Sequence, residues 1–110
     1  MTPIGTQYRQ GDVFLEVVAA LPPGLTPRPR DRGRIVLAYG EATGHAHVID
    51  APSDTDAIYD DPTGGFYLRF AGAVGLVHEE HSRIDLPALV YRGTIQREWS
   101  DAEEPIQVLD

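Results

Sequence analysis

Turn-forming residues interrupt this chain so often that the stretches between them are short. The 110 residues include 11 glycines and 9 prolines, gathered in segments such as Pro22-Pro23-Gly24 and Asp60–Gly65. The intervening stretches are rich in β-branched and aromatic residues, which favour strands, and none shows the pattern of a long amphipathic helix. We therefore expect a mainly β protein, a small antiparallel β-barrel or a jelly-roll or sandwich, in a single domain over residues 1–110.

The clearest expected strand covers 89–99, where Leu89, Tyr91, Ile95 and Trp99 share one face and polar side chains occupy much of the other. Further strands are expected at 11–21, 34–39, 45–49, 57–59, 66–70 and 71–77. Two other segments are predicted to lie outside the sheets: a Pro/Arg-rich loop at 22–33 and an acidic C-terminal tail at 100–110. The arginines of the loop are interpreted as offsetting local negative charge, with phosphate binding as the less favoured alternative.

Composition excludes several classes of chemistry. The chain has no cysteine, which removes disulfides and thiolate ligands, and all 9 of its basic residues are arginine, which removes lysine-dependent catalysis. A net charge of -8 disfavours nucleic acids and anionic membranes as partners. No stretch has the length of a transmembrane helix and no signal peptide is recognisable, so a cytoplasmic location is expected.

The 4 histidines fall into two close pairs, His45 with His47 and His78 with His81. On a strand, side chains two residues apart project from the same face, roughly 7 Å apart at the backbone. A turn would bring His78 and His81 onto one side. We predict that the two pairs share one divalent transition-metal ion, for which imidazole suits Zn, Fe, Ni, Mn or Cu.

Glu79 and Glu80, between the second pair, are the candidate catalytic residues, either as orienters of a ligand or as a general base. Three histidines with a carboxylate or water would leave an open coordination position, whereas four would close the site. The His78-Glu-Glu-His81 segment is one residue shorter than the zinc-peptidase helix motif, which argues against a metallopeptidase.

The segment Gly40-Glu-Ala-Thr-Gly-His45-Ala-His47 resembles the first cupin motif, in which a glycine precedes a His-x-His pair on a strand. The resemblance implies a β-barrel with a metal ion, carried over to His45, His47 and one of His78 or His81. This chain departs from the motif in its shorter glycine-to-histidine spacing, in lacking the following glutamate, and in lacking the Pro-x-Gly of the second motif. The pattern also resembles small bacterial proteins.

These observations give a leading hypothesis and two alternatives. The leading one is a metal-binding small β-barrel that could act as a metalloenzyme, with no reaction specified. One alternative is a non-catalytic protein-interaction or assembly module with structural histidines. The other is a metal-free cluster in which imidazoles beside glutamates respond to pH. A short chain with several strands is also expected to cover its sheet edges as a homo-oligomer.

Overall fold

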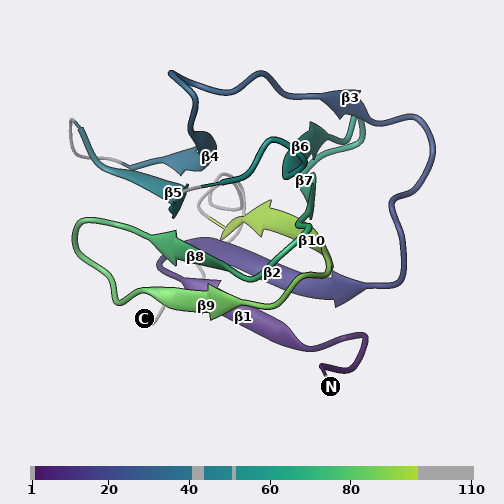
Figure 1. The fold of residues 1–110 in the computed structure, drawn as a ribbon, viewed down its shortest axis with the longest axis horizontal. Coiled ribbons are helices and arrows are strands. Elements are labelled where there is room, and N and C mark those ends of the chain that lie inside the picture. Colours follow the sequence, from purple (N-terminus) through teal and green to yellow (C-terminus); the bar gives the residue numbers. More distant parts are fainter. Residues whose placement is uncertain (1, 41–43, 51, 97–110) are drawn as a thin grey trace, which may run out of the picture.

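The computed structural model describes residues 2–40, 44–50 and 52–96, which form two antiparallel sheets (Figure 1). The larger sheet has the order β1-β2-β10-β7-β6-β3 and the smaller one β4-β5-β8-β9. The strands of the larger sheet are β1 (Gln7–Gln10), β2 (Val13–Val18), β10 (Val90–Ile95), β7 (Phe66–Arg69), β6 (Ala57–Asp60) and β3 (Thr26–Pro27). Those of the smaller sheet are β4 (Ile35–Tyr39), β5 (Ala46–Asp50), β8 (Val74–Val77) and β9 (Ile84–Leu86).

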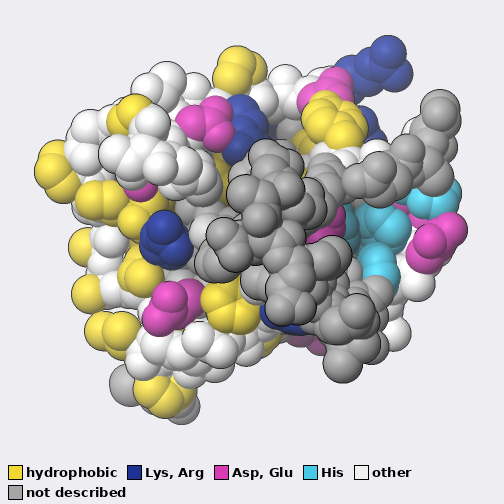
Figure 2. All heavy atoms as spheres, turned by 180° about the vertical axis from the view of Figure 1, so that it is seen from behind, with side chains coloured by type: hydrophobic (Ala, Val, Ile, Leu, Met, Phe, Trp, Pro, Cys, Tyr) yellow, Lys and Arg dark blue, Asp and Glu magenta, His cyan; other side chains and the backbone are white. Residues whose placement is uncertain are grey.

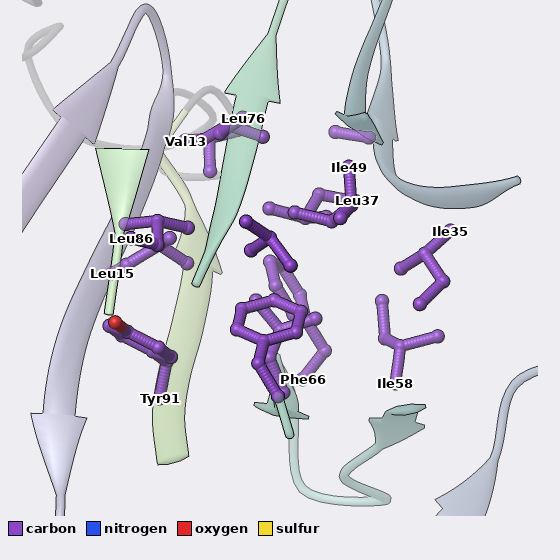
Figure 3. Close-up of a cluster of buried hydrophobic side chains, with 14 of the residues drawn as sticks. Val13, Leu15, Ile35, Leu37, Ile49, Ile58, Phe66, Leu76, Leu86 and Tyr91 are labelled. Carbon is purple, nitrogen blue, oxygen red and sulfur yellow. The ribbon is translucent and has the colours of Figure 1, made fainter. Parts of the chain in front are cut away.

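The hydrophobic core lies between the two sheets. Along β2, every second side chain is buried, as expected for a strand with one face in a core. Leu15 of this strand, Leu86 of β9 and Tyr91 of β10 belong to the same cluster of buried side chains (Figure 3). Burial of each large aliphatic side chain contributes about 1.5–3 kcal/mol to folding, so this shared layer holds the sheets together.

The expected mainly β, antiparallel, single-domain fold is confirmed. Among the architectures considered, the structure is a sandwich and not a closed barrel. The larger sheet ends at β1 and β3 and the smaller one at β4 and β9, and no ladder joins these edges within the described residues. The part of the chain that the structure describes also contains no helix able to cross a membrane. The homo-oligomer, which would cover such edges, stays a prediction.

Each of the seven expected strands corresponds to a strand of the structure, and the 34–39/45–49 and 57–59/66–70 hairpins are present as β4–β5 and β6–β7. Three short strands were not expected: β1, β3 and β9. The first is polar, and the other two are too short to show a period. Strand β3 lies inside the segment 22–33, where its proline is tolerated because the strand is at a sheet edge. Trp99 and the predicted tail at 100–110 lie outside the described residues.

Arg28, just after β3, links the two sheets. Strand β4 has a bulge between Val36 and Ala38, which disrupts its ladder with β5. The Arg28 Nη1 donates to the carbonyl oxygens of Val36 at 2.8 Å and Leu37 at 3.2 Å, and its Nε donates to Asp60 at 3.0 Å. One arginine of the loop therefore satisfies backbone carbonyls at the bulge while pairing with an acid on β6.

A cross-strand pair of glycine and phenylalanine fixes the middle of the larger sheet. Gly93 on β10 lies opposite Phe66 on β7, and the aromatic ring covers the glycine. A Cβ atom at Gly93 would lie 2.2 Å from Cε1 of Phe66. The ring is 1% exposed and has the Arg28 guanidinium 5.3 Å from its centroid, so it has little space to move.

We predict that Gly93→Ala lowers the free energy of unfolding by about 1–3 kcal/mol, because the added methyl group overpacks this contact. Urea denaturation measures the change. Gly72→Ala is the matched control, since a Cβ there meets nothing within 4 Å. Equal stability of the two variants would contradict the packing account.

Candidate metal centre

The antiparallel pairing of β5 with β8 brings the two histidine pairs together. Val48 of β5 lies opposite Val77 of β8, so the same register places His47 opposite His78, one residue beyond the ladder. The ring centroids of His47 and His78 are 4.3 Å apart. His45 comes immediately before β5, and His81 lies in the turn that leads to β9.

The imidazole of His78 lies at the centre of the cluster, with the other three around it. Its centroid is 4.6 Å from that of His81 and 5.6 Å from that of His45, and those of His47 and His81 are 5.9 Å apart. Imidazoles that bind one ion at about 2 Å have ring centroids roughly 5 Å apart. Figure 2 shows histidine side chains together in one patch of the surface, beside acidic side chains. The ligand atoms that lie within 4.8 Å of one another are those of His45, His78 and Glu79.

His47 is the buried member of the cluster. It points to the same side of β5 as the core residue Ile49, because side chains alternate along a strand, and its side chain is 2% exposed. Burial, with a further contribution from neighbouring His78, lowers the pKa of His47 to about 4, against the opposing effect of Asp12. His47 is therefore a neutral imidazole at neutral pH, the form that binds metal ions.

A buried glutamine, Gln10 at the end of β1, determines which nitrogen of His47 carries the proton. The Gln10 Nε2 donates to the carbonyl oxygens of Leu76 at 2.9 Å and Ser82 at 3.0 Å. These bonds fix the orientation of the amide, so its Oε1 faces Nδ1 of His47 at 2.8 Å. Since this oxygen can only accept, Nδ1 donates, and the neutral ring keeps its lone pair on Nε2.

The turn between β1 and β2 contacts two of the imidazoles. Gly11 and Asp12 form a two-residue hairpin loop in which Gly11 has a φ of 59°, a conformation that favours glycine. A Cβ at Gly11 would lie 2.7 Å from Nε2 of His81 and 3.3 Å from Cε1 of His47. The Asp12 Oδ1 lies 3.4 Å from Nε2 of His47. Any side chain at Gly11 would therefore require the His81 ring to shift.

The two candidate glutamates differ in environment. Glu79 Oε1 accepts the backbone N–H of Ala46 at 3.0 Å, and this bond is the main cause that lowers the pKa of Glu79. Glu79 also offers a ligand atom within 4.8 Å of those of His45 and His78. Glu80 is 69% exposed, with Oε2 3.7 Å from Nδ1 of His45. Glu79 is thus a fixed carboxylate, whereas Glu80 faces solvent.

A pocket of about 640 Å³ opens beside the cluster, where the edge strands β1 and β9 lie side by side (Figure 1). Arg9, Gln10 and Gly11 line one side of it, and Glu80, His81 and Ile84 line the other. An ion bound near His81 would therefore be accessible to water or to a small molecule.

Sequence reasoning identified the four histidines and missed Gln10, Gly11 and Asp12. The Gly-Asp pair before an alternating apolar run is a signal for a two-residue hairpin. That signal could have placed the turn, but not its contact with residues more than thirty positions away. The structure brings the four histidines together and places Glu79 and Glu80 beside His45; that they form a metal site stays a prediction.

The depressed pKa of His47 predicts a pH dependence of stability in metal-free protein. The unfolded chain binds the proton near pH 6.5 and the folded one near 4, so stability falls as pH decreases through this window, by at most about 1.4 kcal/mol per pH unit for one group. Urea midpoints from pH 7.5 to 4.5 in the presence of chelator measure it. The difference between wild type and His47→Gln should shrink toward acid pH; a constant difference would contradict the prediction.

Comparison with known proteins gives a family and no activity. No curated protein and no solved structure matches the chain. A family model described as a domain of unknown function, DUF8820, matches residues 9–96. This range includes the hairpin turn at Gly11, both histidine pairs and all strands from β2 to β10. The chain belongs to the DUF8820 family.

Proposed function

We propose that this protein binds a divalent transition-metal ion through its histidine cluster, His45, His47, His78 and His81. The observation that carries the proposal is the meeting of imidazoles from two separate segments: the ring centroids of His47, His81 and His45 lie 4.3, 4.6 and 5.6 Å from that of His78. His47, the buried imidazole of the cluster, is neutral at neutral pH and so in the form that binds a metal ion. Nitrogen donors with nearby carboxylates favour Zn, Fe, Ni, Mn or Cu over Ca or Mg.

Binding at His78 requires a local adjustment. Its Nδ1 accepts the backbone N–H of Glu80 at 3.0 Å, which places the ring proton on Nε2. The N–H of Glu80 must move away before either nitrogen can bind an ion. An ion on Nδ1 would take the place of this N–H, and an ion on Nε2 would require the ring proton to move to Nδ1, where the N–H now donates. The turn from His78 to His81 is therefore the part of the site that adapts, whereas His47 is held in place.

The pocket beside His81 favours a site with an open coordination position, as catalytic metal sites have. Of the two glutamates, Glu80 is the better candidate for a general base, because it lines this pocket and is free of the backbone bond that holds Glu79. The competing function is a non-catalytic interaction module, in which the same histidines bind no ion and only shape the end of the sandwich.

Metal removal tests the proposal. Ligands from two segments bind the ion only in the folded state, so added Zn²⁺ should raise the melting temperature of chelator-treated protein by several degrees. A free Zn²⁺ concentration one hundred times Kd raises the free energy of unfolding by about 2.7 kcal/mol. Elemental analysis gives the ion that the protein retains on purification. His47→Ala and His78→Ala should each remove the response to Zn²⁺.

Ile58→Val serves as control, since it removes a methyl group from the core on β6, outside the cluster, at a cost of about 0.5–1.5 kcal/mol. It should melt at a lower temperature and keep the full Zn²⁺ response. If wild type, both histidine variants and this control respond alike to Zn²⁺ and chelator, the metal proposal is wrong and the interaction module is favoured.

A further inference from the structure

We propose that the β1–β2 turn is a third segment of the metal centre: Asp12 supplies a carboxylate ligand to the ion that His47 binds, and Gln10 positions His47 for it. This inference rests on the proposed function and extends it from an all-histidine cluster to a mixed nitrogen and oxygen site. Neither residue lies in the two histidine motifs.

The geometry of Asp12 and His47 is that of two ligands of one ion. Oδ1 of Asp12 and Nε2 of His47 are 3.4 Å apart. Ligand atoms about 2.1 Å from a tetrahedral ion lie about 3.4 Å from one another. In the neutral ring, both facing atoms carry lone pairs, so a cation between them replaces a repulsive contact with two attractive ones.

Gln10 makes this arrangement specific to one nitrogen. Its amide is 3% exposed and uses both hydrogens on backbone carbonyls, so its oxygen cannot turn away from Nδ1 of His47. Metal-binding histidines usually donate their other N–H to an oxygen, which fixes the ring and raises its basicity. Gln10 fits this positioning role through the 2.8 Å bond to Nδ1.

The turn itself is held firmly enough to present a ligand. The backbone N–H of Gln96 donates to the carbonyl oxygen of Asp12 at 2.9 Å, which ties the loop to the end of β10. Gly11 lets the loop approach His81, so the turn that carries Asp12 contacts both His47 and His81. A carboxylate there offsets part of the charge of a divalent ion that would otherwise be costly to bury.

Titration of chelator-treated protein with Zn²⁺ and Co²⁺, followed by calorimetry and Co²⁺ absorption, tests the inference. Asp12→Asn keeps the size of the side chain and removes its charge, and we expect it to raise Kd at least about 10-fold, as loss of supporting groups around metal sites does, and to change the Co²⁺ spectrum. The control Asp54→Asn removes the same charge from an exposed loop residue and should bind as wild type does.

The outcomes separate this inference from the proposed function. Wild-type binding with an unchanged Asp12→Asn variant overturns the role of Asp12 and leaves the histidine site standing. Absence of binding by wild type overturns both. If Asp12→Asn fails to fold, NMR of Co²⁺-loaded wild type decides: the Asp12 Hβ protons must show large paramagnetic shifts, and ordinary shifts overturn the assignment.

Nitrogen NMR tests Gln10 separately from stability. Long-range ¹H–¹⁵N correlations should show His47 of metal-free wild type as the Nδ1–H tautomer, and Gln10→Leu should shift the ring toward a mixture of tautomers while raising Kd for Zn²⁺ about 10-fold or more. A folded Gln10→Leu protein with an unchanged tautomer and unchanged Kd overturns the positioning role.

Discussion

The pairing of β5 with β8 is the interaction on which the rest of the site depends. This ladder sets Val48 opposite Val77 and so carries His47 and His78 to one place. It also places Ile49 and Leu76 opposite each other in the core, where both are almost fully buried. A shift of one residue would turn these side chains to the other face of the sheet, so the burial of the core and the meeting of the histidines are fixed by the same register.

The buried imidazole of His47 needs polar contacts for its nitrogens, and the β1–β2 hairpin supplies side chains that lie beside them. His47 would lose more free energy on burial than its packing returns if its nitrogens had no polar contacts. Gln10 accepts the N–H of Nδ1, and the turn that follows it, made narrow by glycine, places the Asp12 carboxylate beside Nε2. No buried side-chain nitrogen or oxygen within the described ranges lacks a hydrogen-bond partner. The cluster is therefore a satisfied part of the fold, with His47 already oriented.

The open architecture determines how the cluster meets solvent. In a closed barrel, β1 and β9 would be joined by a ladder; here they are edges of different sheets, and the pocket lies between them. Arg28 supports the sandwich elsewhere, where it satisfies carbonyls at the bulge of β4. The His78–His81 turn contributes Glu80 and His81 to the lining of this pocket.

The sequence by itself determined the mainly β fold, two hairpins and the histidine pairs, because these depend on local signals: glycine and proline at turns, alternating side chains, and the two-residue spacing of His45 and His47. It did not determine that the sheets stay separate, since strand order and closure depend on contacts between distant residues. Nor did it identify Gln10 or Asp12, whose types and spacing carry no metal signal. Only the tertiary structure places them on His47, because packing of the first hairpin against β5 and β8 joins segments that no local pattern relates.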